Sequence, residues 1–185
     1  MGNLNNIEFY NTPDGAIMVQ EAGKPVREFT ENDRDMVTEL LRHIREVYKP
    51  ITFQSLSEEY SKYQRNRIHF EFQMAGRFCK CNFGEYDALN YDIDHNGIFN
   101  LEEVRCPLRG ECKYEGKICK PEINSVLTDR EKEVIELIAS GKQSNEISDE
   151  LNISVATVNR HRENIKAKLH LRSVSEITNY YFTHK

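Results

Sequence analysis

"LTDREKEVIELIASGKQSNEISDELNISVATVNRHRENIKAKLHLRSVSEITNYYF" (residues 127–182) has the spacing of four short helices and decides the fold of the C-terminal part of the chain. Thr128 and Glu131 are placed as a capping box, Gly141 suits a left-handed helix end, and Ser154 suits a helix start. Apolar residues recur at helical spacing between these signals. The predicted buried residues are Val134, Ile135, Leu137, Ile138, Ile147, Leu151, Val155, Val158, Ile165, Leu169, Ile177 and Tyr181. We therefore predict an all-α four-helix domain over residues 125–185.

Basic side chains gather on the third predicted helix. Residues 154–172 contain Arg160, Arg162, Lys166, Lys168 and Arg172 against Glu163 alone. The whole of residues 125–185 carries nine basic and nine acidic side chains. DNA binding needs cations only at the contact face, so a local stripe on a neutral body favours DNA as the partner. The alternative is a solvated helical face that binds nothing.

The same segment resembles the LuxR/GerE-type helix-turn-helix of bacterial transcription regulators. The matching positions are Leu127, Thr128, Arg130, Glu131, Glu133, Val134, Gly141, Glu146, Ile147, Leu151, Ile153, Ser154, Thr157, Val158, His161, Ile165, Lys168 and Leu169. The resemblance implies that the third helix enters the major groove of double-stranded DNA. It also implies a homodimer paired through the last helix, with Ile177, Tyr180 and Tyr181. Asn159 departs from the family, which usually has lysine after Thr-Val.

We expect DNA contacts from the second and third helices of this domain. The residues that we assign to the third helix's contacts are Thr157, Asn159, Arg160 and His161 near the bases or first phosphates, and Lys166 and Lys168 on the DNA backbone. Ser144 and Asn145 begin the preceding helix, where exposed N–H groups favour a phosphate. Asn159 can read adenine through two hydrogen bonds. The same substitution could instead weaken a phosphate contact, for which Arg160 and Arg162 would compensate.

Residues 1–122 have the pattern of an α+β module. Residues 7–10 and 16–20 are short β-like runs around a turn. A helix is predicted from Thr30 to the residues before Pro50, with an apolar stripe of Met36, Val37, Leu40, Leu41, Ile44 and Val47. Residues 55–63 favour a shorter helix and residues 68–74 a strand. His43 beside the stripe is typical of a structural histidine.

Residues 76–120 contain all five cysteines of the chain. Cys81, Cys106, Cys112 and Cys119 could supply the four ligands of a tetrahedral zinc site. Cys79 could replace Cys81, because residues two apart on a strand point to the same side. An iron–sulfur cluster also takes four cysteines, and buried free thiols are the third interpretation. The region resembles a cysteine-bearing segment found before LuxR-type domains in proteins of Bacteroidetes and their mobile elements, and this resemblance implies no chemistry.

The stretch DIDHNGIFNLEE (residues 92–103) fits the spacing of a calcium-binding loop. Such loops lie between two helices, whereas Cys106-Pro107 follows this one closely. We therefore favour a hairpin turning at Asn96–Gly97, which suits a tight turn between strands, over a bound calcium ion.

The net charge of −5, the mean hydropathy of −0.69 and the lack of a long apolar run indicate a soluble cytoplasmic protein without a membrane partner. No nucleophile–base pair or phosphate-binding loop is present, so we expect no enzyme. The units expected of a two-component response regulator, alternating β-strands and helices, are also missing. The sequence predicts a DNA-binding transcriptional regulator. The alternative is a metal sensor or interaction module whose helical domain binds proteins, and a steep salt dependence would distinguish DNA binding from it.

Overall fold

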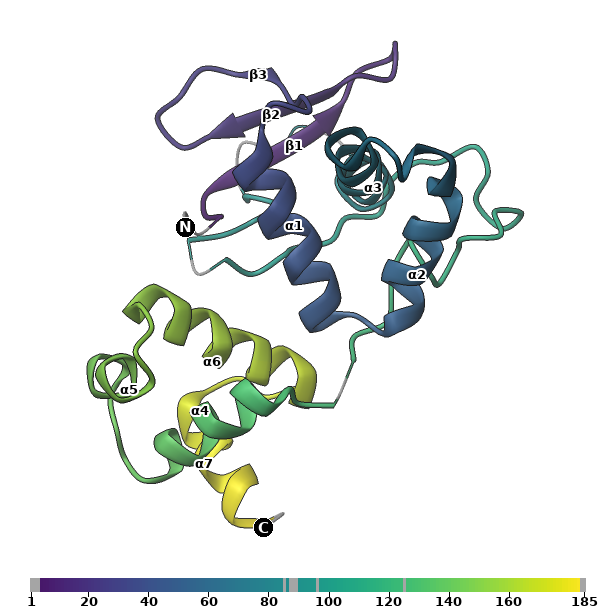
Figure 1. Ribbon diagram of the computed structural model, residues 1–185. Coiled ribbons are helices and arrows are strands. Elements are labelled where there is room, and N and C mark those ends of the chain that lie inside the picture. The colour runs from purple at the N-terminus through teal and green to yellow at the C-terminus, as the bar shows by residue number, and fades with distance from the viewer. Residues whose placement is uncertain (1–3, 85, 87–89, 96, 125, 184–185) are drawn as a thin grey trace. The chain divides into compact units, whose positions relative to one another are not determined.

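The computed structural model of the protein describes residues 4–84, 86, 90–95, 97–124 and 126–183 (Figure 1). The chain divides into two compact units, Met1–Glu122 and Ile123–Lys185. Ser125, where the predicted C-terminal domain begins, lies outside the described residues. The first unit contains a small sheet with helices and the second is helical, so the predicted fold class is confirmed.

A three-stranded antiparallel sheet opens the N-terminal unit, in the order β1-β2-β3. Strands β1 (Ile7–Asn11) and β2 (Ile17–Glu21) confirm the two predicted β-runs, and β3 (Arg27–Glu28) is a short addition. Phe9 pairs with Val19 across β1 and β2, and both side chains are buried. One face of the sheet therefore belongs to the core. Two-residue strands carry no recognisable periodicity, so the sequence does not predict β3.

Helix α1 (Arg34–Val47) buries every residue of its predicted stripe. It begins later than Thr30, because the Thr30 backbone N–H donates to the Asp33 carboxylate at 2.8 Å and holds a turn before the helix. Helix α2 (Pro50–Glu59) begins earlier than predicted. Its first residue is a proline, which suits the first turn of a helix because proline has no N–H and a donor at that position would have no intrahelical partner.

Helix α3 (Arg67–Asn82) shows that the predicted strand at residues 68–74 is wrong. The alternation of apolar residues that indicates a strand lies in the first half of α3, where Ile68 is 49% exposed. The buried face continues beyond it at helical spacing, through Met74, Ala75, Phe78, Cys79 and Asn82. Asn66 caps the helix by accepting the His69 backbone N–H. The longer helical stripe therefore outweighs the short alternation.

Aromatic rings fill the core of the N-terminal unit. Phe9 stacks on Phe83 at 5.6 Å between ring centroids, and Phe83 meets Phe78 and Phe99 at 6.1 and 6.0 Å. His43 stacks on Phe99 at 3.6 Å and is 8% exposed. The structural interpretation of this histidine is therefore confirmed, since its ring packs within the core.

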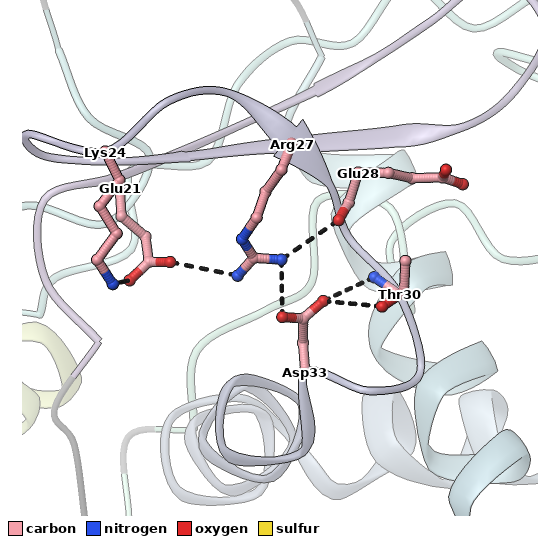
Figure 2. Close-up of polar contacts among 6 residues, drawn as sticks. All are labelled: Glu21, Lys24, Arg27, Glu28, Thr30 and Asp33. Carbon is pink, nitrogen blue, oxygen red and sulfur yellow. Dashed lines mark hydrogen bonds and ion pairs between the residues drawn. The ribbon is translucent and has the colours of Figure 1, made fainter.

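A charged network joins the end of the sheet to the start of α1 (Figure 2). The Arg27 guanidinium pairs with the Glu21 carboxylate at 3.2 Å and with the Asp33 carboxylate at 2.7 Å. The second Asp33 oxygen accepts hydrogen bonds from both the backbone N–H and the hydroxyl of Thr30. Arg27 therefore connects β2 and β3 to the first residues of α1.

Residues 92–103 use their polar groups to hold the backbone. The Asp92 carboxylate accepts the Phe9 backbone N–H at 2.6 Å, and Asp94 accepts that of Ile98 at 3.0 Å. Ile93 and Phe99 form an antiparallel bridge, as the hairpin interpretation predicts. Asn96, which we placed in the turn, lies outside the described residues.

The C-terminal unit contains four helices, coloured green to yellow in Figure 1: α4 (Asp129–Ala139), α5 (Ser144–Leu151), α6 (Val155–Leu169) and α7 (Val174–Thr183). The predicted capping box of Thr128 and Glu131 is confirmed, and Gly141 has the predicted left-handed backbone, with φ of +87°. The buried core of the C-terminal unit consists of Val134, Ile135, Ile138, Ile147, Val158, Ile165 and Ile177. The other predicted residues pack partly buried against this core, except Val155, which is 37% exposed. Val155 lies about 60° around α6 from Val158, which turns it away from the buried stripe.

Candidate nucleic-acid interface

Helices α5 and α6 are joined by the three-residue turn Asn152–Ser154. Asn152 ends α5 in the left-handed conformation, with φ of 52° and ψ of 46°. Ser154 begins α6, because its hydroxyl accepts the Thr157 backbone N–H at 3.1 Å. Two helices joined by a turn of this length are typical of a helix-turn-helix, in which the second helix is presented to the DNA groove.

The first half of α6 presents the residues predicted near the bases. Asn159 is exposed, and its neighbours Thr157 and Arg160 are half-buried. Further along the helix, the Lys166 ammonium pairs with the Glu163 carboxylate at 2.7 Å. One acidic side chain on this helix therefore offsets one of its cations, so the contact face is less positive than a count of basic residues indicates.

Ser144 connects the start of α5 to α6. Its hydroxyl donates to the Asn159 side-chain oxygen at 2.8 Å and accepts a hydrogen bond from the Arg162 guanidinium. Sequence reasoning named Ser144 and Asn159 separately and did not place Arg162 in the contact with them. The signal that could have found it is the i, i+3 spacing of Asn159 and Arg162, which puts neighbouring side chains on one helix face.

The first turn of α5 has a capping box of its own. The Gln143 side chain accepts the Glu146 backbone N–H, and the Glu146 carboxylate accepts the Gln143 backbone N–H at 2.7 Å. The Glu146 carboxylate therefore already lies at the helix start where a phosphate was expected beside Ser144 and Asn145. Asn145 itself is exposed.

Two of the residues assigned to DNA are inside the domain. Lys168 is 0% exposed, and its ammonium lies 2.8 Å from the Glu131 carboxylate. His161 is 7% exposed. Both lie on the same side of α6 as Val158 and Ile165, because steps of three and four residues return to one helix face. The expectation that Lys168 and His161 contact DNA is therefore corrected: their side chains pack in the domain.

The last helix divides between core and surface. Ile177 is fully buried among the core residues of its own domain, so it is not available to pair two chains as the resemblance implied. Tyr180 and Tyr181 pack partly buried against that core. Phe182 is 66% exposed, and its ring meets Tyr181 at 5.6 Å between centroids. The exposed apolar group at the end of α7 is therefore Phe182.

The predicted metal ligands come from two parts of the N-terminal unit. Cys81 lies in the last turn of α3, while Cys106, Cys112 and Cys119 follow in the irregular segment 104–120. Cys79 is buried in α3, and the reason given for letting it replace Cys81 does not hold, because this segment is a helix. Residues two apart on a helix point in different directions, unlike those on a strand.

Among the described residues, one group of three side chains has potential metal-ligand atoms within 4.8 Å of one another, and it consists of Glu8, Asp92 and Glu102. Sequence reasoning did not find it, because its members come from distant segments. These carboxylates accept backbone hydrogen bonds: Glu8 from Asp92, and Glu102 from Gly84. The Glu8–Asp92 and Asp92–Phe9 bonds attach the segment after α3 to β1, and the Glu102–Gly84 bond lies within that segment.

Residues 125–181 match the family described as bacterial regulatory proteins, luxR family. This match, on a segment with a three-residue turn between α5 and α6, decides the identity of the C-terminal unit. Residues 125–181 are a LuxR-family helix-turn-helix domain. Asn159 is a position at which this LuxR-type domain departs from the usual residue of the family. None of the helices in the described part of the chain combines the length and apolar character of a membrane span.

The chain is similar to the response regulator protein VraR of Staphylococcus aureus (strain NCTC 8325 / PS 47), with 32% identity over 92 residues, 45% of this chain and 44% of that protein. It is 30% identical over 98 residues to VraR of Staphylococcus saprophyticus, covering 53% of this chain and 44% of that protein. The chain therefore spans less than half the length of these curated relatives. A comparison with solved structures gave no significant match.

Proposed function

We propose that the protein is a sequence-specific transcriptional regulator that binds double-stranded DNA through helix α6 of its LuxR-type domain. The observation that carries this proposal is the α5–turn–α6 arrangement within the family match, with Asn159 exposed on the first half of α6. Residues near the start of a recognition helix are the ones that contact base edges in such domains.

The side chains on α6 have different proposed roles. Asn159 contacts a base edge, since a side-chain amide can pair with adenine through two hydrogen bonds. Thr157 and Arg160 contact the bases or the nearest phosphates, and Lys166 contacts the backbone further along the helix. Arg162 acts through Ser144, because the hydrogen bonds between them hold the start of α5 against Asn159.

We further propose that two copies bind one site, with the exposed ring of Phe182 in the contact between them. Phe182 is 66% exposed on the helix that the family resemblance assigns to pairing, and its ring meets Tyr181, so the two rings offer a small apolar contact. The Phe182→Ser variant should shift the protein towards monomer in analytical ultracentrifugation. An unchanged sedimentation profile would remove α7 from the interface. We further propose that the N-terminal unit supplies the signal that changes DNA binding.

The test of DNA binding starts from a site selected by the full-length protein out of a random duplex pool. Affinity for that site is measured by fluorescence anisotropy over a series of salt concentrations. We expect a steep loss of affinity with salt, because each neutralised phosphate contributes about 0.9 to the slope of log affinity against log salt. Arg160→Ala should lower this slope by about 1 if Arg160 contacts a phosphate.

Asn159→Ala should instead cost about 1–3 kcal/mol at the selected site and relax the preference at one base pair, with little change in slope. The matched control is Lys132→Ala on α4, which removes an exposed cation that pairs with Asp129. It should bind as the wild type does. Equal effects of Arg160→Ala and Lys132→Ala, or binding without salt dependence, would contradict the proposal and favour a protein-binding surface.

A further inference from the structure

The cysteine segment is fastened to the end of α3 by one buried side chain. Asn82, the residue after Cys81, is fully buried and donates from its side-chain nitrogen to the Ile118 carbonyl at 2.9 Å. Its side-chain oxygen accepts the Lys120 backbone N–H at 3.0 Å. These two bonds clamp the residues on both sides of Cys119. They therefore hold Cys119 beside the helix end that carries Cys81.

The start of the segment returns to the same place. The Glu102 backbone N–H donates to the Asn82 carbonyl at 2.8 Å. Arg109 then donates to the Val104 carbonyl at 2.5 Å and to the sulfur of Cys119 at 3.5 Å. Residues 102–104 and Cys119 are therefore neighbours, although the segment between them forms a loop.

Tight turns within the loop 104–120 position Cys106 and Cys112. The Cys106 carbonyl accepts the Arg109 N–H at 3.1 Å, and the Cys112 N–H donates to the Leu108 carbonyl at 2.9 Å. The Cys119 N–H returns to the Tyr114 carbonyl at 3.2 Å. The loop can turn this often because its two glycines, Gly110 and Gly116, have positive φ.

Cys81 is half-buried at the end of α3. Burial raises its pKa to about 11, the Arg77 guanidinium opposes this, and the thiols of Cys119, Cys112 and Cys106 raise it further. Cys106 and Cys112 are half-buried, so solvent reaches the group.

Two arginines lie beside the four thiols. Arg109 donates to the Cys119 sulfur, and the Nε of Arg77 is buried with no hydrogen-bond partner. A divalent ion with four thiolates has a net charge of −2, which two guanidinium groups would offset. Buried charges are tolerated in proteins when they are compensated in this way.

We propose that Cys81, Cys106, Cys112 and Cys119 bind one structural zinc ion, which closes the loop 104–120 onto the end of α3. Four thiolates on short turns are a common ligand set of structural zinc, with zinc–sulfur distances of about 2.3 Å. No three of these sulfurs lie within 4.8 Å of one another. A tetrahedral zinc site needs the four sulfurs closer together than this. An iron–sulfur cluster would need inorganic sulfide in addition.

The test is the metal content of full-length protein, expressed with added zinc chloride and purified anaerobically. We expect about one zinc per chain by mass spectrometry, and nearly none in Cys112→Ser. The matched control is Cys79→Ala, which removes the fifth cysteine from the same helix as Cys81 and should keep its zinc. Cobalt(II) added to metal-free wild-type protein should give sulfur-to-cobalt charge-transfer absorption and a tetrahedral d–d spectrum. This readout does not depend on whether the variants fold.

Three results would overturn the proposal. Wild-type protein that contains no zinc and gives no cobalt charge-transfer band would show that the thiols hold no ion. Iron with acid-labile sulfide would assign the cysteines to a cluster. Zinc retained by Cys112→Ser, or lost from Cys79→Ala, would contradict the ligand set.

Discussion

The ammonium of Lys168 lies 2.8 Å from the carboxylate of Glu131, and both side chains are buried, at 0% and 1% exposure. The same Glu131 oxygen accepts the Thr128 backbone N–H at 2.7 Å, within the capping box of α4. One carboxylate therefore caps the first helix of the LuxR-type domain and neutralises a lysine of the recognition helix. This ion pair fixes α6 against α4.

Lys168→Ala should destabilise the domain by about 3–5 kcal/mol, because it leaves the buried Glu131 carboxylate without its cation. The measurement is urea unfolding of the full-length protein, monitored by a spectroscopic signal that reports on the C-terminal unit. Lys166→Ala is the matched control on the same helix. Its partner Glu163 is one turn away on the same helix and keeps some contact with solvent, so the loss should be smaller than in Lys168→Ala. Similar losses in the two variants would show that the Lys168–Glu131 pair has no special role.

Asn82→Ala should loosen the cysteine loop. The variant removes side-chain hydrogen bonds to Phe78, Ile118 and Lys120, and we expect a loss of about 2–4 kcal/mol, since buried backbone groups lose their partners. Thermal unfolding gives the size of the effect. Limited proteolysis should show earlier cleavage within residues 104–120. Asn5→Ala, at an exposed site, should change neither quantity, and unaltered cleavage in Asn82→Ala would contradict this account.

Asp33→Ala should weaken the start of α1. The carboxylate binds Thr30 and Arg27 with its two oxygens (Figure 2), so its removal should cost about 1–2 kcal/mol. Circular dichroism during urea unfolding measures the loss. Glu28→Ala is the control, because the Glu28 residue joins the network only through its backbone carbonyl. A larger loss in Glu28→Ala than in Asp33→Ala would be inconsistent with the network.

Tyr48 predicts an alkaline limit to the stability of the N-terminal unit. Burial raises the pKa of its hydroxyl well above the ordinary value of 10.0. The folded state therefore favours the neutral tyrosine, and its contribution is fully present below pH 10 and lost as the pH rises further. The loss should be about 1.4 kcal/mol per pH unit above 10. Tyr48→Phe should show a shallower decline in urea unfolding between pH 9 and 11.5.

The control for this titration is Tyr91→Phe, since Tyr91 is 40% exposed. Its pH dependence should follow that of the wild type. If Tyr48→Phe and the wild type decline in parallel, other groups cause the alkaline loss.

Local signals in the sequence predict the C-terminal helices well. A capping box or a left-handed glycine depends only on residues a few positions apart. The capping box of Thr128 and Glu131 and the helix end at Gly141 can therefore each be recognised from a short stretch of sequence. The buried stripe of α1 was equally predictable from the sequence, because six apolar residues recur at helical spacing. Residues 68–74 show the limit of such reasoning: a short apolar alternation favours a strand, and the buried face that makes α3 a helix continues for eight residues beyond it.

The sequence by itself determined the LuxR-type domain and the position of its helices, because periodicity and capping are local properties. Only the tertiary structure decided which basic residues remain at the surface. Lys166 and Lys168 are two positions apart on α6. Lys168 pairs with Glu131 of α4, which lies 37 residues earlier in the chain, whereas Lys166 pairs with Glu163 of α6 itself. Likewise, the loop 104–120 returns to Cys81 through the contacts of Asn82. A one-dimensional pattern contains the charges and thiols, but their partners depend on how distant segments pack.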